Sequence, residues 1–153
     1  MNTDRKYKIF TQLKLVIIHS EGRIDFQEMK QFMDHLKDDP EYDISFNSIV
    51  DLRNSKAAPD MKQMELFMKN LFKAEFMTER KDVFITNTPD HVILPYLLKQ
   101  KSEELPLKIQ VTSSLEAAVD FLELNEDDLL LLKKSFSELK SNSEPYEDFK
   151  LPP

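Results

Sequence analysis

The fold is decided by residues 7–37, which read YKIFTQLKLVIIHSEGRIDFQEMKQFMDHLK. Residues 7–10 and 13–19 are rich in aromatic and β-branched side chains, and the short link between them predicts a hairpin of two strands. The second strand contains the run LVII at residues 15–18, which is apolar on both faces. A strand of this kind is covered on both sides, which is typical of a sheet that lies between two layers of helices.

The remainder of this stretch predicts an amphipathic helix that ends at about Lys37. Gly22 predicts a turn before the helix. Asp25 and Glu28 have the spacing of a capping box, in which a side chain accepts hydrogen bonds from free amides at a helix start. Apolar residues then recur at helical spacing: Phe26, Met29, Phe32, Met33 and Leu36.

Strands and helices continue to alternate along the rest of the chain. Further strands are predicted at residues 44–52, 83–86 and 107–112, with a turn region at 54–59. Further helices are predicted at about residues 60–77, after the Thr88–Pro89–Asp90 helix start, after a Ser113–Glu116 capping box and after Asn125. The predicted order is ββαβαβαβαα, which indicates an α/β fold with a mainly parallel mixed sheet of about five strands flanked by helices.

One domain accounts for most of the chain. We expect a single α/β domain over residues 1–140, including an added C-terminal helix. The polar, proline-containing segment 141–153 is predicted to be a flexible tail.

Composition excludes several classes of function. The 153 residues include no cysteine and one glycine, and the net charge is −7. The lack of cysteine excludes a thiol nucleophile, and a single glycine excludes the usual phosphate-binding loops. The negative charge opposes binding to nucleic acid and to anionic membranes. The longest apolar run, residues 15–18, is too short for membrane insertion. We therefore expect a cytoplasmic protein without a metal site or cofactor.

Polar residues at the predicted carboxyl ends of the strands are candidate binding residues. Asp51 and Arg53 lie two residues apart on one strand, and Asn87 and Thr88 follow the next. Ligands of open α/β sheets bind at this edge, so these residues form a possible anchor for a polar ligand or a partner. The alternative is that Asp51 and Arg53 form an ion pair that holds the following loop.

The methionine-rich predicted helix Met61–Met77 is a second candidate. Met64, Phe67 and Met68 form an adaptable apolar surface in one interpretation, because thioether side chains repack easily. In the alternative they are ordinary core residues packed on the sheet.

Several short motifs are similar to those of the bacterial SpoIIAA-like group of STAS and SEC14-type domains. They are Gly22–Arg23–Ile24–Asp25, the Asp39–Pro40–x–Tyr42 segment, Val50–Asp51–Leu52–Arg53, and the helix that begins at Ser114–Leu115–Glu116. The resemblance implies a βα superhelix with a regulatory or binding role. It also implies a phosphorylatable serine near Asp60, but neither serine nor glycine stands there. Asp60 itself either mimics a permanent charge or caps the helix.

These observations favour a non-enzymatic regulatory or protein-interaction module, whose partner is another protein or a second copy of the chain. The alternative is a small-molecule or lipid-binding domain with an apolar pocket under the Met61–Met77 helix. An enzyme ranks third, because the sequence offers no activated nucleophile and therefore no catalytic residue.

Overall fold

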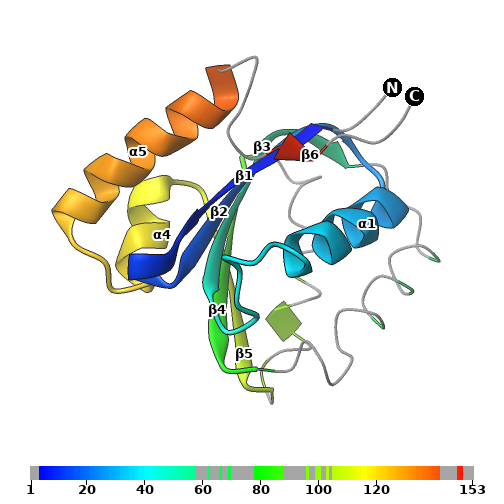
Figure 1. The fold of residues 1–153 in the computed structure, drawn as a ribbon, viewed down its shortest axis with the longest axis horizontal. Helices are drawn as coiled ribbons and strands as arrows, with labels where there is room; N and C mark the ends of the chain where they lie inside the picture. The colour runs from blue at the N-terminus through cyan, green and yellow to red at the C-terminus, as the bar shows by residue number, and fades with distance from the viewer. Residues whose placement is uncertain are drawn as a thin grey trace.

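A six-stranded mixed sheet with helices on both faces forms the centre of the protein (Figure 1). This arrangement is seen in a computed structural model of the chain, which describes residues 4–57, 62, 66, 69, 78–87, 96, 99–100, 103, 105–141 and 148–149. The predicted α/β class is confirmed. Two helices were predicted, at about residues 60–77 and after Thr88. Both lie mostly outside the described residues.

The strands have the spatial order β5-β4-β3-β2-β1-β6. They are β1 (Asp4–Phe10), β2 (Leu15–Ile24), β3 (Asn47–Ala57), β4 (Arg80–Ile85), β5 (Leu107–Thr112) and β6 (Asp148–Phe149). Strands β2 to β5 are parallel neighbours, and β1 is antiparallel to both β2 and β6. The short β6 comes from the segment predicted as a tail, and the sequence did not predict that strand.

Three helices and one 3-10 turn are described. They are α1 (Phe26–Lys37), α4 (Leu115–Phe121), α5 (Glu126–Ser141) and the 3-10 turn η1 (Thr11–Leu13), which connects β1 to β2. Asp25 caps α1 as predicted, because its side chain accepts hydrogen bonds from the backbone amides of Gln27 and Glu28 at 2.9 and 3.1 Å. Among the described residues, no helix has both the length and the apolar character needed to cross a membrane.

The predicted boundaries near Gly22 and after residue 53 are wrong. Gly22 does not form a turn: it lies inside β2 with a φ of 83°, a backbone conformation that glycine adopts without steric cost. Residues 54–57 belong to β3 and not to a turn. The pairing of β2 with β3 shifts register between His19 and Glu21 and then continues to the ends of both strands. Hydrogen bonding between the two strands therefore extends both of them past their apolar segments.

The cap of α4 also differs from the prediction by one residue. Ser114, and not Ser113, accepts a hydrogen bond from the Ala117 amide at 3.1 Å. Its extended backbone, with φ −146° and ψ 155°, is the conformation that an N-cap requires. Asn125 accepts a hydrogen bond from the Asp128 amide at 2.8 Å at the start of α5, as predicted.

Two apolar cores lie on the two faces of the sheet. Figure 1 shows α1 on one face and α4 and α5 on the other. The core on the side of α4 and α5 includes Ile17, Ile49, Val83, Ile85 and Leu132. The core on the side of α1 consists of Tyr7, Ile9, Val16, Ile18, Phe32 and Leu36. Alternate residues of β2 therefore face opposite cores, which explains why this strand is apolar on both faces.

Candidate functional site

The structure brings two of the predicted site residues, Asp51 and Arg53, into direct contact. Arg53 donates from Nε to Asp51 Oδ1 at 2.9 Å and from Nη2 to Asp51 Oδ2 at 3.1 Å. The backbone amide of Arg53 also donates to Oδ1 at 3.0 Å. Burial opposes ionisation of Asp51, but the interaction with His19 and the hydrogen bonds from Arg53 lower its pKa well below the usual range. This geometry is the ion pair that the sequence analysis left as an alternative.

His19 completes this cluster, and the sequence did not single it out as a site residue. His19 lies opposite Asp51 in the parallel pairing of β2 and β3. Its Nδ1 is 3.7 Å from Asp51 Oδ2, and its Nε2 is 2.9 Å from Glu21 Oε1. Burial lowers the pKa of His19, but the two carboxylates outweigh burial and raise it. Knowledge of the strand register would have predicted the contact. Within the described residues, His19 Nδ1 is buried without a hydrogen-bond partner, so its interaction with Asp51 is electrostatic. The cluster links the middle of β2 to the middle of β3.

The other predicted site residues do not join this cluster in the described part of the chain. Asn87 is exposed two residues beyond the end of β4. The remaining candidates lie outside the described residues: Asp60, Met64, Phe67, Met68 and Thr88.

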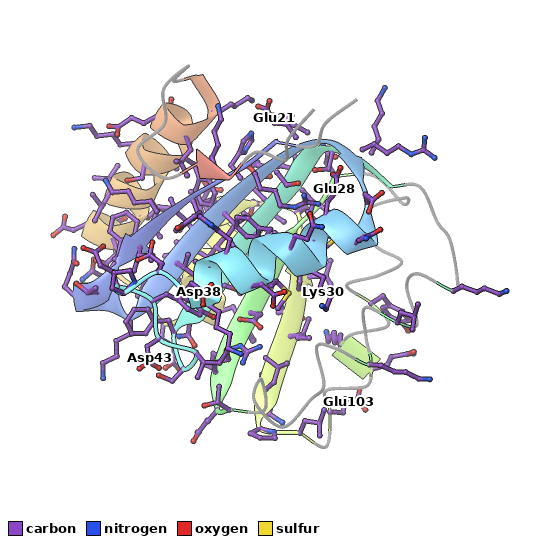
Figure 2. All side chains as sticks on the ribbon, turned by 45° about the vertical axis from the view of Figure 1, so that its right-hand side comes forward. Glu21, Glu28, Lys30, Asp38, Asp43 and Glu103 are labelled. Carbon is purple, nitrogen blue, oxygen red and sulfur yellow. The ribbon has the colours of Figure 1, made fainter. Side chains whose placement is uncertain are left out.

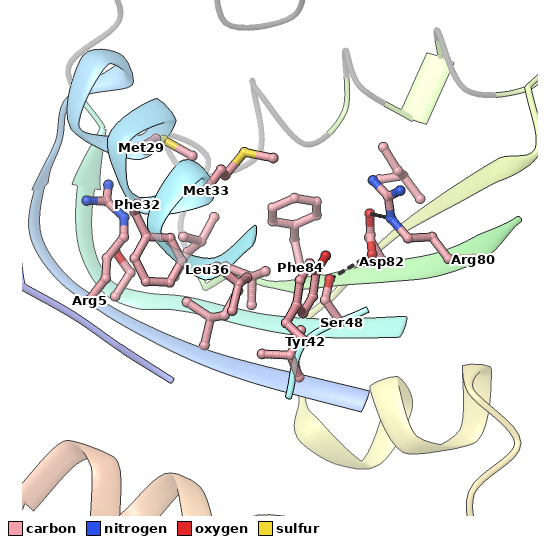
Figure 3. A pocket seen from close by; sticks show the side chains of 16 residues that line it. Arg5, Met29, Phe32, Met33, Leu36, Tyr42, Ser48, Arg80, Asp82 and Phe84 are labelled. Carbon is pink, nitrogen blue, oxygen red and sulfur yellow. Dashed lines mark hydrogen bonds and ion pairs between the residues drawn. The ribbon is translucent and has the colours of Figure 1, made fainter. Parts of the chain in front are cut away.

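A pocket of about 110 Å³ lies on the opposite face of the sheet, between α1 and the strands (Figure 3). Helix α1 contributes Met29, Phe32, Met33 and Leu36, which belong to its predicted apolar stripe. The strands contribute Val16, Ile18, Val50, Leu52, Phe84 and Ile109. The pocket therefore lies under α1. The apolar pocket predicted from the sequence was expected under residues 61–77, most of which are outside the described residues.

One end of the pocket carries a satisfied polar group (Figure 3). Arg80 donates from Nε to Asp82 Oδ2 at 3.0 Å, and Ser48 donates from its hydroxyl to Asp82 Oδ1 at 2.8 Å. Burial raises the pKa of Asp82 in spite of Arg80 and Ser48. Burial also raises the pKa of the adjacent Tyr42 to about 12. Tyr42 is therefore a neutral hydroxyl at physiological pH.

The other end of the pocket carries Arg5, which is only 4 % exposed. Its Nη2 is buried without a hydrogen-bond partner in the described part of the chain. Burial lowers the pKa of Arg5 to about 10, although Glu28 and Asp25 oppose this shift. Figure 3 shows Arg5 and Arg80 at opposite ends of the pocket. A buried cationic donor without a partner is costly, and it marks this end as a place where a ligand atom would be stabilised.

The pocket has the chemistry of a binding site. Its centre is apolar and its polar groups lie at the two ends, which is the usual composition of a small-molecule site. Within the described ranges, no cluster of three or more histidine or carboxylate side chains is arranged to hold a metal ion.

No protein-family model matches the sequence, and no curated protein is significantly similar to it.

Proposed function

We propose that this protein binds a small, largely apolar molecule in the pocket between α1 and the sheet. The observation that carries the proposal is the combination of an apolar cavity of about 110 Å³ with the buried, hydrogen-bond-deficient Nη2 of Arg5 at its end. Apolar walls provide affinity, and a few convergent polar groups orient the ligand. This function corresponds to the small-molecule alternative that was predicted from the sequence.

The cavity volume limits the size of the ligand. An apolar cavity of about 150 Å³ holds benzene in an engineered protein, so a cavity of about 110 Å³ suits a ligand of roughly four to six non-hydrogen atoms. At a ceiling of about 1.5 kcal/mol per non-hydrogen atom, a ligand of six such atoms binds with at most about 9 kcal/mol, which is a Kd of about 0.3 μM. Binding assays should therefore cover sub-micromolar to millimolar concentrations.

We infer that the fold is a SpoIIAA-like superhelix. The support is that β2, β3, β4 and β5 are neighbours in chain order and run parallel. A regulatory or protein-interaction role stays a second proposal. Its support is the exposure of two neighbouring leucines on α5, Leu130 at 64 % and Leu131 at 37 %.

Titration with benzene tests the small-molecule proposal. The chain has seven methionines, and ¹³C-methyl labelling gives each of them an NMR signal. The signals of Met29 and Met33 are assigned with the variants Met29→Leu and Met33→Leu. We expect benzene to shift these two signals saturably, because both side chains line the pocket.

A filled pocket provides the control for this titration. Met33→Trp should abolish saturable binding by occupying the cavity, whereas Leu131→Trp, on the exposed surface of α5, should leave it unchanged. If benzene shifts neither Met29 nor Met33 in the native protein, or shifts the Met29 signal equally in the native protein and in Met33→Trp, the pocket does not bind small apolar molecules.

A further inference from the structure

Two oppositely charged side chains near the pocket each have a buried atom without a hydrogen-bond partner. These atoms are Nη2 of Arg5, a donor, and Oε2 of Glu28, an acceptor. Neither has a hydrogen-bond partner within the described part of the chain, so the two atoms are not bonded to each other. Native proteins rarely leave buried polar atoms in this state, and each such atom calls for a partner.

Both atoms belong to elements that enclose the pocket. Arg5 lies on β1 opposite Ser20 of β2, and both residues line the pocket. Glu28 lies in the first turn of α1, immediately before the pocket-lining Met29 and four residues before Phe32 on the same helix face. Figure 3 shows the Arg5 guanidinium on the Met29 side of the pocket, and Figure 2 shows Glu28 on α1.

The local charge balance restricts the ligand that this end would accept. The guanidinium of Arg5 provides one positive charge, and two carboxylates, Glu28 and Asp25, act on it. A carboxylate ligand would add a third negative charge beside an oxygen of Glu28 that already lacks a hydrogen-bond donor. A neutral group adds no charge, and it satisfies both buried atoms if it carries an acceptor and a donor.

We propose that the ligand of this pocket is a small neutral amphiphile whose head group accepts a hydrogen bond from Arg5 Nη2 and donates one to Glu28 Oε2, as a primary amide does. The inference rests on the proposed function, because it assigns the head group of a molecule whose apolar part occupies the pocket. A pocket built to hydrogen-bond a head group strongly rejects analogues that lack the donor, because its own buried groups then remain unsatisfied.

Three probes with a common isopropyl group and equal numbers of non-hydrogen atoms test the head group. Isobutyramide carries an acceptor and a donor, 3-methyl-2-butanone carries only an acceptor, and isobutyrate carries a negative charge. Each is titrated into the labelled protein at neutral pH, with the Met29 methyl signal as the readout. We expect isobutyramide to bind at least tenfold more tightly than either of the others.

The outcomes separate this inference from the proposed function. Equal affinity for the amide and the ketone would overturn the head-group assignment and leave apolar binding intact. Tighter binding of isobutyrate would show that Arg5 selects an anion and would also overturn the assignment. Saturable binding of none of these probes, together with no binding of benzene, would overturn both proposals.

Variants of the two charged residues provide a second, independent readout. The double variant Arg5→Met with Glu28→Leu replaces both buried charges by apolar groups, which proteins tolerate better than the loss of one partner. This variant should bind the ketone and the amide with affinities within about twofold of each other, because neither buried group remains to discriminate. Arg23→Met, at an exposed position on β2, should preserve the tenfold preference for the amide. A preserved preference in the double variant would contradict the assignment.

Discussion

Nδ1 of His19 lies 3.7 Å from Oδ2 of Asp51, and the two residues face each other across the parallel strands β2 and β3. The contact lies immediately before the irregularity at which the pairing of the two strands shifts register. A protonated imidazole between Asp51 and Glu21 would therefore stabilise the pairing of the two strands next to this irregularity. The position of His19 also makes this part of the fold sensitive to pH.

The contribution of His19 should be measurable as a pH dependence of the folding stability. Because the pKa of His19 is raised in the folded protein above its model value of 6.5, its stabilising contribution is complete below that pH and is lost as pH rises through the folded pKa. We expect the urea midpoint of the native protein to fall as pH rises above 6.5, and His19→Gln to remove this part of the decrease. His35→Gln, at an exposed position on α1, should retain it. Superimposable pH profiles of the native protein and His19→Gln would refute the assignment.

The Asp51–Arg53 pair should account for part of the loss of folding stability at acid pH. Because the pKa of Asp51 is lowered, its contribution is present above the unfolded value of 3.8 and is lost as pH falls below it. Arg53→Met should cost about 1–3 kcal/mol at pH 6, since it leaves a buried carboxylate short of hydrogen bonds. The variant should also lose less stability than the native protein between about pH 6 and pH 3.

Chemical denaturation at both pH values measures this effect. Arg23→Met removes an exposed arginine and serves as the control for the lost positive charge. An equal cost for the two arginine substitutions at pH 6 would show that the contacts with Asp51 contribute nothing specific.

Two leucines of α5 provide a matched test of the core between this helix and the sheet. Leu132 is 0 % exposed in the core, whereas Leu130 on the same helix is 64 % exposed. Leu132→Ala should reduce the free energy of unfolding by about 2–5 kcal/mol, because it leaves a cavity. Leu130→Ala should change it by less than about 0.5 kcal/mol. Urea denaturation of both variants measures the difference, and similar values would mean that α5 does not pack as described.

The N-cap of α1 should contribute measurably to stability. Asp25→Ala removes the acceptor of two backbone amides and should cost about 1 kcal/mol, whereas Asp25→Asn retains a side-chain acceptor and should cost much less. Thermal unfolding of both variants gives the comparison. Because the amides of Gln27 and Glu28 lose their hydrogen-bond acceptor in Asp25→Ala, their exchange with solvent should also accelerate. Unchanged exchange there would contradict the capping role.

Local signals in the sequence were sufficient for several elements. The predicted strand at residues 107–112 coincides with β5, and the cap at Asp25 and the apolar stripe of α1 were predicted from spacing alone. The ends of β2 and β3 were not predictable in this way. Gly22 and the polar residues after Arg53 favour a turn locally, but hydrogen bonding between the two strands keeps both segments extended.

The candidate sites also include residues that local sequence predicts and residues that it does not. Asp51 and Arg53 were predicted because they are two residues apart on one strand, so the sequence itself places them on one side. Arg5 and Glu28 were not predicted as site residues, because nothing within a few residues of either indicates that the other is near. Their burial depends on how β1 and α1 pack around the pocket.

By itself, therefore, the sequence determined the α/β class, the capped helix α1 and the two-sided apolar character of β2, since each depends on residues a few positions apart. Only the tertiary structure decided the contact of His19 with Asp51, the location of the pocket under α1, and the burial of the Arg5 and Glu28 side chains. These features depend on strand register and helix packing. They follow from the combined energy of many contacts between residues far apart in the chain, which no single local pattern encodes.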